Sequence, residues 1–216
     1  MNPEYPGLFV SVEGCDGCGK TTVIALLKKA LEEKGVTPLV TREPGGGRIA
    51  ESIRAIILDK ENTNEDKRTE ALLYAASRRQ HLVDVVIPAL QKGTLVISDR
   101  YLDSSLAYQG YARGIGIEEV YSINAFAIDG YMPEITFYLD LPPKEGLARI
   151  AAHRSDKVDR LDVEKLSFHE KVYEGYKIVN EKYKDRIVRI DAHKTPEEEV
   201  QEILPILLLK YQEKKQ

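Results

Sequence analysis

Residues Leu8 to Thr22, LFVSVEGCDGCGKTT, decide the fold of this chain. The stretch begins with apolar and β-branched residues that predict a buried strand, and it leads into VIALLKKALEEK, an amphipathic run that predicts a helix. Between them lies Gly14-x-x-x-x-Gly19-Lys20-Thr21, the pattern of a phosphate-binding loop in the strand-loop-helix setting that such a loop requires. The sequence therefore predicts an α/β protein that binds a nucleotide.

The residue types in this loop suit phosphate. Glycines let the backbone approach an anion closely, so that successive N–H groups and the N-terminus of the following helix point at phosphate oxygens. Lys20 adds a positive charge for the β- and γ-phosphates, and the Thr21 hydroxyl is suited to bind Mg²⁺. A glycine-rich turn with an unrelated lysine would not need both flanking elements.

Composition narrows the class of protein. The chain has 216 residues, of which 43% are hydrophobic, so it can bury a large core as one domain. Its 31 basic and 35 acidic residues leave a net charge of −4, which argues against binding to nucleic acid or a membrane surface. No apolar run approaches the roughly 20 residues of a membrane span, and no leader is evident, so we expect a cytoplasmic protein.

Both cysteines, Cys15 and Cys18, lie in the phosphate loop. Their C-x-x-C spacing is also found in redox and zinc sites, but no second cysteine pair occurs, and a phosphate loop is not the setting of a redox motif. We expect two small loop residues in a reducing compartment. A second hypothesis is that the helix N-terminus favours a reactive thiolate whose oxidation blocks the nucleotide, although Asp16 opposes it.

A second predicted strand, residues 36–43, brings Arg42 to its carboxyl end, the edge where ligands bind in open parallel sheets. Arg42 is therefore either an anion ligand or a solvated loop charge. Residues 48–58 predict a helix, and the polar residues 59–66 predict an exposed loop.

The next helix should run from about Arg68 to Val86 and end near Pro88. At 100° per residue, one face carries Tyr74, Ser77, Arg78 and His81. The opposite face, which we expect to be core, carries Leu72, Ala75, Ala76, Leu82, Val83 and Val86. The polar face is either solvated or a wall of the site, and for His81 alone we expect a surface or structural role.

The strand predicted at residues 94–101 delivers Asp99 and Arg100 to its carboxyl end. An acid at this position beside a phosphate loop is placed to hold Mg²⁺ and its waters, and the adjacent arginine can bind a second phosphate. Asp103, a capping-type residue, should start a short helix.

The rest of the chain alternates helices and strands. We expect helices at residues 117–128, 163–183 and 196–211 and strands at residues 134–141 and 186–191. Within residues 142–162 we expect a helix that runs into a charged segment. The charged segment holding Arg149, Arg154 and Arg160 is either a solvated loop or a mobile lid over the phosphates. Alternating strands and helices predict a parallel sheet covered by helices on both faces.

The motifs taken together resemble those of thymidylate kinases, in their bacterial form. They follow the family's order along nearly the whole chain: Gly14 to Thr22, Thr41 to Gly46, Arg68 to Arg78, Asp99 to Tyr101 and Ser104 to Gly110. The sequences REPGG and DRYLDSSLAYQG are far more specific than the phosphate loop. The resemblance implies a nucleoside-monophosphate-kinase-like P-loop NTPase fold, a five-stranded parallel sheet in one domain (residues 1–216) with a lid at about 149–160, and a homodimer. It also implies transfer of the γ-phosphoryl group of ATP to dTMP in dTTP synthesis.

Site residues follow from the same resemblance. The residues implied to bind ATP are Gly14, Cys15, Asp16, Gly17, Cys18, Gly19, Lys20, Thr21 and Thr22. Those implied to bind dTMP are Asp16, Arg42, Glu43, Arg54, Tyr74, Ser77, Arg78, Arg100, Ser104, Ser105, Tyr108 and Gln109. Thr21 and Asp99 are implied to hold Mg²⁺.

Among these residues, Arg42 and Arg100 resemble the family's ligands of the acceptor phosphate, with Arg54 nearby. Asp16 would take the 3′-hydroxyl group, and Tyr108 would favour deoxyribose. Thymine would stack on Tyr74, where relatives often carry Phe, while Arg78 donates to O4 and Gln109 contacts N3–H. The position after Asp16, where some members carry a catalytic arginine, holds Gly17. The catalytic set is therefore Lys20, Asp99 and Arg100 with Arg149 and Arg154, two lid arginines that we do not rank.

Three other functions stay open at this stage. The acceptor could be another pyrimidine nucleotide or a deoxynucleoside, although a nucleoside would bring no phosphate to Arg42 and Arg100. A GTPase-type switch would carry a guanine-binding Asn-Lys-x-Asp sequence, which is absent. A nucleotide sensor would bind nucleotides without turnover.

Overall fold

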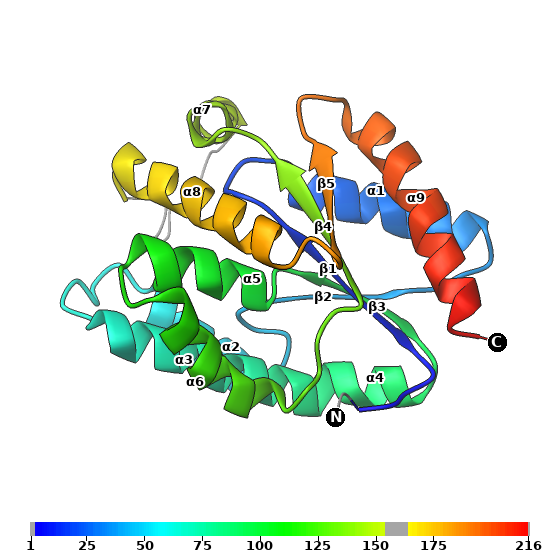
Figure 1. Cartoon of the computed structure of the whole chain (residues 1–216), viewed down its shortest axis with the longest axis horizontal. Helices are drawn as coiled ribbons and strands as arrows, with labels where there is room; N and C mark the ends of the chain where they lie inside the picture. Colours follow the sequence, from blue (N-terminus) through cyan, green and yellow to red (C-terminus); the bar gives the residue numbers. More distant parts are fainter. Residues whose placement is uncertain (1–2, 154–163, 216) are drawn as a thin grey trace.

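The computed structural model describes residues 3–153 and 164–215 of the chain. Its centre is a five-stranded sheet with the order β2-β3-β1-β4-β5 (Figure 1). The strands are β1 (Leu8–Glu13), β2 (Leu39–Arg42), β3 (Leu95–Asp99), β4 (Ile135–Asp140) and β5 (Ile187–Asp191). Every pair of neighbours is parallel, so all carboxyl ends meet at one edge. The predicted α/β fold and five-stranded parallel sheet are confirmed.

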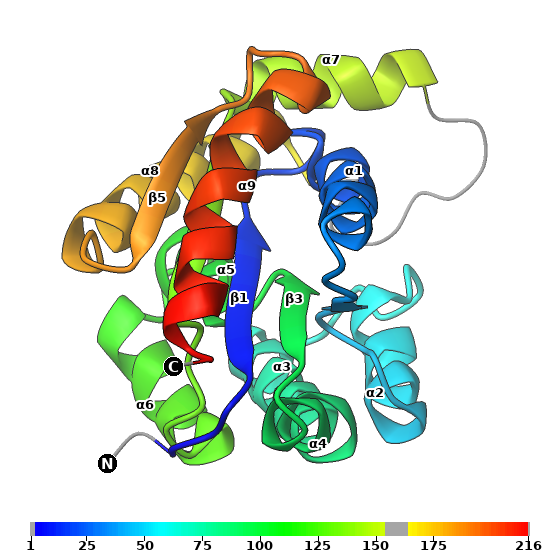
Figure 2. The same cartoon turned by 90° about the vertical axis from the view of Figure 1, so that its right-hand side faces the viewer.

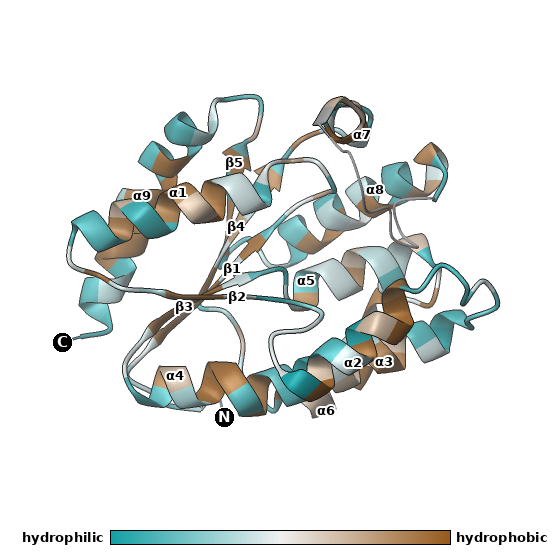
Figure 3. Cartoon of the chain, turned by 180° about the vertical axis from the view of Figure 1, so that it is seen from behind, coloured by the Kyte–Doolittle hydropathy of each residue, from teal (hydrophilic) through white to brown (hydrophobic). Residues whose placement is uncertain are grey.

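One face of the sheet is covered by α1 (Lys20–Glu33) and α9 (Pro196–Glu213), which lie side by side in Figure 1. Alternation along β1 explains the two cores, because Val10 belongs to the cluster with α1 and α9, whereas Phe9 packs into the cluster on the other face. The central strands β1, β3 and β4 are accordingly buried on both sides, and the sheet lies between more polar helices (Figure 3).

The other face is covered by a larger group of helices. They are α3 (Lys67–His81), α4 (Ile87–Gln91), α5 (Leu102–Ser105), α6 (Ile117–Ile128) and α8 (Leu166–Lys182). Beside α3 packs α2 (Arg48–Leu58), and α7 (Pro143–His153) lies beyond the carboxyl end of β1 (Figure 2). The predicted helix bounds at residues 48–58 and 117–128 agree with the structure.

The expectation that the long helix ends near Pro88 is wrong. After α3 the chain makes a π-helical turn, η1 (Leu82–Val86), and then continues through Pro88 into α4. Pro88 stands in the first turn of α4, where its missing N–H costs little, and the wider turn before it accommodates the ring. A proline therefore divides this helical segment without ending it.

The predicted core face of this segment is only partly correct. Ala75, Leu82 and Val86 are buried, but Leu72 is 56% exposed, Val83 is 46% exposed and Ala76 is exposed. The reason is that α3 turns its polar face inward, so that the Ser77, Arg78 and His81 side chains are buried. Hydrophobic periodicity cannot foresee a buried polar face.

Asp103 does not cap a helix. It is 1% exposed, and its carboxylate accepts hydrogen bonds from Arg186 at 2.5 and 2.8 Å. The following residues form another π-helical segment, η2 (Leu106–Ala112), which packs on α8.

Candidate active site

The phosphate loop connects β1 to α1 at the carboxyl edge of the sheet. Its backbone requires glycine at Gly17, where φ is +77° and an added Cβ would lie 2.1 Å from the carbonyl oxygen of Gly146. Gly19 has φ +100° and stands directly before the first turn of α1, whose free N–H groups form an anion site. The local sequence thus builds the predicted cradle.

Lys20 is buried against the loop. Its ammonium donates to the carbonyl oxygens of Gly14 at 3.0 Å and Cys15 at 3.1 Å, and it lies 3.7 Å from the Cys18 sulfur. Lys20 also lines a cavity beyond the loop, together with Asp16, Gly17, Gly19, Thr21, Thr22, Arg42, Glu43, Arg54, Asp99, Arg100, Arg149, Ile150 and Pro196. This cavity gathers the loop and five cationic side chains.

Asp99 and Thr21 fit a magnesium site on their own chemistry. Oδ1 of Asp99 is a buried oxygen that lacks a hydrogen-bond partner, and both residues line the cavity beyond the loop. Mg²⁺ in phosphate-transfer sites is held by one or two protein oxygens together with phosphates and water. In the described residues no cluster of three or more His, Cys, Asp or Glu side chains could hold a metal ion.

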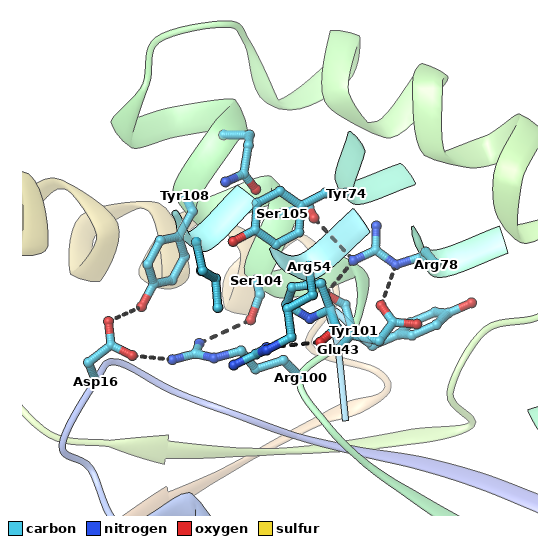
Figure 4. A pocket seen from close by; sticks show the side chains of 13 residues that line it. Asp16, Glu43, Arg54, Tyr74, Arg78, Arg100, Tyr101, Ser104, Ser105 and Tyr108 are labelled. Atoms are coloured by element: carbon cyan, nitrogen blue, oxygen red, sulfur yellow. Dashed lines mark hydrogen bonds and ion pairs between the residues drawn. The ribbon is translucent and has the colours of Figure 1, made fainter. Parts of the chain in front are cut away.

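A second cavity of about 160 Å³ adjoins the first (Figure 4). Its walls are Asp16, Glu43, Pro44, Arg54, Leu58, Tyr74, Arg78, Arg100, Tyr101, Ser104, Ser105, Tyr108 and Gln109. They come from the loop after β1, the end of β2, α2, α3, the end of β3, α5 and η2. Asp16, Glu43, Arg54 and Arg100 line both cavities and therefore mark their junction.

At the junction Arg100 binds Asp16. Nη2 of Arg100 donates to Oδ1 of Asp16 at 2.5 Å, and the Tyr108 hydroxyl donates to Oδ2 at 2.8 Å (Figure 4). Burial alone would raise the pKa of Asp16, but Arg100, Lys20 and the Tyr108 hydroxyl hold that pKa below its ordinary value. Asp16 is therefore a carboxylate at neutral pH.

Arg78 is held from several sides. Its Nε donates to Oε2 of Glu43 at 2.7 Å, Nη1 donates to Asn124, and Nη2 donates to the Tyr101 carbonyl oxygen and the Ser105 hydroxyl, each at 3.1 Å. A guanidinium has five N–H donors, so within the described part of the chain one donor, on Nη1, is left for a ligand.

Glu43 fixes this arginine instead of presenting a free carboxylate. Its second oxygen, Oε1, lies 2.9 Å from Nδ1 of His81, and Nε2 of His81 lies 2.7 Å from the Thr41 hydroxyl. His81 is fully buried, which agrees with the structural role expected for it and excludes the surface position. Ser77 likewise supports the loop after β2, since its hydroxyl accepts from the Gly45 N–H at 3.2 Å.

Three further expected ligands lie in the second cavity. Nε2 of Gln109 donates to Glu70 at 2.8 Å, which leaves the amide oxygen as the acceptor available to a ligand. Tyr74 and Tyr108 each contribute an aromatic ring to the wall (Figure 4). The cavity therefore combines aromatic surface with the remaining donor of Arg78 and the amide acceptor of Gln109.

Arg42 and Arg54 meet at the chain after β2. Both donate to the Pro44 carbonyl oxygen, at 3.0 and 2.9 Å, and Arg42 also pairs with Glu51 at 3.0 Å. Arg54 and Arg100 lie at the junction of the two cavities, and Arg42 lines the first cavity beside them.

Of the expected lid, the structure describes the beginning. Arg149 lies on α7, lines the first cavity and donates to the Ala192 carbonyl oxygen at 3.0 Å. Arg154 and Arg160 lie outside the described residues.

The two thiols are buried. Burial raises the pKa of both Cys15 and Cys18 above its ordinary value, and Cys15 is 2% exposed. Their protonated form dominates at neutral pH, so the hypothesis of a reactive thiolate loses its basis. Both are free thiols.

Sequence reasoning missed the residues that support this site. They are Glu13 at the end of β1, Glu70 on α3, Asn124 on α6 and Tyr176 on α8. Glu13 directly precedes the phosphate loop, and an acid at that point of a buried strand was the one available signal.

Separately, no helix among the described residues is long and apolar enough to cross a membrane.

Comparison with known proteins identifies what this site is similar to. The family model for thymidylate kinase matches residues 12–203. A thymidylate kinase of Geobacillus thermodenitrificans is 59% identical over 86% of this chain and 83% of its own length, and one of Clostridium novyi is 54% identical over 91% and 96%. A crystal structure of thymidylate kinase from Ehrlichia chaffeensis matches with a TM-score of 0.73 and 30% identity, covering 94% of this chain and 98% of that one.

Proposed function

The chain belongs to the thymidylate kinase family, and we propose that its two adjoining cavities transfer the γ-phosphoryl group of ATP to dTMP, giving dTDP and ADP. The observation that carries this proposal is their junction. There the phosphate loop meets Arg54 and Arg100 at the mouth of a cavity with an aromatic wall, with Arg42 beside them in the first cavity. Transfer of a phosphoryl group depends on positioning and on charge stabilisation, and this junction supplies both.

The donor side is the first cavity. Backbone N–H groups of the phosphate loop and the N-terminus of α1 bind the β- and γ-phosphates, and Lys20 supplies a positive charge beside them. Arg149, at the edge of the same cavity, is the described lid arginine that can approach the donor. Thr21 and Asp99 would hold Mg²⁺, which when bound neutralises negative charge on the donor phosphates.

The acceptor phosphate lies at the junction. Arg42, Arg54 and Arg100 are the cations that bind it and turn its oxygen toward the donor. This oxygen is already ionised near neutral pH, so the chain needs no general base to remove a proton. Asp16 keeps its charge and accepts the 3′-hydroxyl group of the sugar beside Tyr108.

The second cavity recognises thymine. The ring stacks on Tyr74, the remaining N–H of Arg78 donates to O4, and the Gln109 amide oxygen accepts from N3–H. Compared with thymine, cytosine exchanges donor and acceptor at both of these polar positions, whereas uracil differs only in lacking the methyl group. Hydrogen-bonding sites discriminate by roughly 10⁴-fold, and one methyl group in an apolar pocket by about 10 to 200-fold.

The test of this function is ADP production from Mg-ATP with dTMP, dUMP, dCMP, UMP and dGMP. We expect dTMP to have the highest kcat/KM, dUMP to follow within about 200-fold, and dCMP to give no turnover above about 10⁻⁴ of the dTMP value.

The other outcomes separate the remaining functions. Preference for another pyrimidine monophosphate would reassign the acceptor, and phosphorylation of thymidine itself would make the enzyme a nucleoside kinase. Tight binding of GTP in preference to ATP would point to a switch protein. Nucleotide binding with no turnover of any monophosphate would contradict the kinase function.

We also propose that the enzyme is a homodimer. Three neighbouring helices, α2, α3 and α6, carry exposed apolar side chains. The most exposed is Phe126 at 92%, followed by Leu72 at 56%, Ile56 at 49% and Val83 at 46%. Leu72 on α3 and Val83 on η1 lie along the same side as Arg79, which contacts the end of α6 beside Phe126. Such a surface is suited to a second copy of the chain.

Phe126→Asp is expected to convert the dimer to a monomer, because each subunit would bury a charge in place of an aromatic ring. Loss of a central aromatic contact costs at least about 2 kcal/mol, which is roughly 30-fold in affinity. Light scattering after gel filtration measures the mass. The matched control is Leu209→Asp on α9, 59% exposed on the opposite face of the sheet, which should leave the mass unchanged. A monomeric wild-type protein would contradict the proposal.

A cytoplasmic location is proposed as well. The two thiols of the protein are free and buried, which suits a reducing compartment. The enzyme also takes ATP as its phosphoryl donor.

A further inference from the structure

Glu13 is the last residue of β1 and is 1% exposed. It lines neither cavity, so it touches neither substrate directly. Its carboxylate accepts three hydrogen bonds: from the Tyr101 N–H at 2.7 Å, from the Ser104 hydroxyl at 2.6 Å and from the Tyr176 hydroxyl at 3.0 Å. These three donors surround Arg100.

The first bond acts on the main chain of Arg100. This residue has φ +70°, a left-handed conformation that a residue with a side chain adopts at a cost of about 1–3 kcal/mol. Its own N–H donates to the Val12 carbonyl oxygen at 3.0 Å, and the next N–H, that of Tyr101, donates to Oε1 of Glu13. Glu13 therefore helps to hold the backbone turn that sends the arginine side chain into the site.

The other two bonds act on its side chain. Oε2 of Glu13 accepts from the Ser104 and Tyr176 hydroxyls, and each hydroxyl has one proton to give. With both protons turned to the carboxylate, both oxygens present lone pairs to Nη1 of Arg100, at 3.2 and 3.1 Å. The two hydroxyl oxygens also lie 2.8 Å from each other, and the negative charge on Glu13 favours the arrangement in which both protons point to the carboxylate over one in which one hydroxyl donates to the other.

We infer that Glu13 is a positioning residue that holds Arg100 toward Asp16 and the acceptor phosphate, by its bond to the Tyr101 N–H and through the Ser104 and Tyr176 hydroxyls. The inference rests on the proposed function, because it concerns how Arg100 meets dTMP. An amide in place of the carboxylate would keep the shape. Its NH₂ group, however, would donate hydrogen either toward the hydroxyls, which would turn a hydroxyl proton toward the guanidinium, or toward the Tyr101 N–H, which would lose its acceptor.

Burying the ionised carboxylate of Glu13, which its positioning role requires, lowers the stability of the fold. Four groups face Glu13: Asp103 on α5, Arg100 after β3, Tyr176 on α8 and Arg186 before β5. Burial, and then Asp103, raises the pKa of Glu13 from 4.5 to about 7, against the lowering effects of Ser104, Arg100 and the Tyr101 N–H.

Since the folded protein holds this proton more tightly than the unfolded chain, the contribution of Glu13 to stability is favourable at low pH. It is lost as the pH rises from about 4.5 to about 7. Above that range the carboxylate is ionised, as its positioning role requires.

The test is Glu13→Gln, assayed at about pH 8, where the wild-type carboxylate is ionised. We expect kcat/KM for dTMP to fall about tenfold, mainly through KM for dTMP, with KM for ATP unchanged. The thermal unfolding midpoint at this pH should be equal to or above that of the wild type, because glutamine has no charge to bury. A structural residue would lose stability and activity together. An unchanged kcat/KM would overturn the inference, whereas an inactive wild type would overturn the proposed function itself.

Tyr176→Phe is the second variant, and it keeps the test valid even if Glu13→Gln fails to fold. It removes one of the two hydroxyls without altering Glu13, and we expect a several-fold rise in KM for dTMP. If Glu13 acts through these hydroxyls, the double variant should be no worse than Glu13→Gln alone. Full activity of Tyr176→Phe, or effects of the two changes that simply multiply, would overturn the inference.

Discussion

Lys20→Ala is expected to lower kcat for dTMP phosphorylation about 10³-fold while the protein stays folded. The ammonium of Lys20 is the one lysine charge in the phosphate-loop cavity among its described residues, and it lies against the loop carbonyls at 3.0 and 3.1 Å. Charge on the transferring phosphoryl group develops beside it, and single fixed donors or cations in such sites contribute roughly 10² to 10⁵-fold. Initial rates at saturating ATP and dTMP measure the effect.

The matched control is Lys28→Ala, a lysine further along the same helix, α1. Lys28 is 47% exposed and pairs with Glu32 on the helix surface, so its removal should change kcat by less than about twofold. Far-ultraviolet circular dichroism and the thermal midpoint establish that both variants are folded. Near wild-type turnover in Lys20→Ala would contradict the role given to this lysine.

Sequence alone predicted the parts of the fold that follow from local rules. The strand, loop and helix at residues 8–33 were found because glycine spacing and apolar runs are local, and the helices at residues 48–58 and 117–128 have clean periodicity. The five-stranded parallel sheet was implied by alternation and by the family resemblance. The strand order was not predicted, since it depends on which strands meet across long stretches of chain.

The errors on α3 have one cause. Periodicity divides a helix into a polar and an apolar side and assigns the apolar side to the core. Here the polar side is buried, because Arg78 finds Glu43 and Asn124 within reach, residues 35 and 46 positions away in sequence. The apolar residue Leu72 is left exposed on the outside of the helix. Nothing within the helix itself reveals that its polar side will find these partners.

The candidate site also contains some residues that the sequence motifs point to and others that they do not. Residues in the recognisable motifs, such as Lys20, Asp99 and Arg100, lie around the two cavities. The residues that hold them came from contacts that no motif records. The bond from the Tyr176 hydroxyl to Glu13, for example, spans 163 positions. A sequence motif thus identifies the groups that meet the substrate better than those that orient them.

Arg100→Lys is expected to lower kcat/KM for dTMP about 10²-fold, although the charge is retained. Lysine is also a residue with a side chain, so the left-handed backbone at φ +70° is equally strained in both proteins. The difference lies in geometry. The guanidinium donates through Nη2 to Asp16 and through Nη1 to Ser104, Tyr176 and the Gly14 carbonyl oxygen, and a single ammonium cannot occupy both places.

Each hydrogen bond to a charged group contributes roughly 1.5–3 kcal/mol, so losing one of these directions accounts for the expected factor. The matched control is Arg186→Lys. Its side chain is 16% exposed against 17% for Arg100, and it pairs with Asp103 at the same 2.5 Å, but it lines neither cavity. This control should lower the unfolding midpoint while changing kcat/KM far less. If the two variants lost activity equally, the forked geometry of Arg100 would have no special role in binding the acceptor phosphate, and buried charge alone would explain the result.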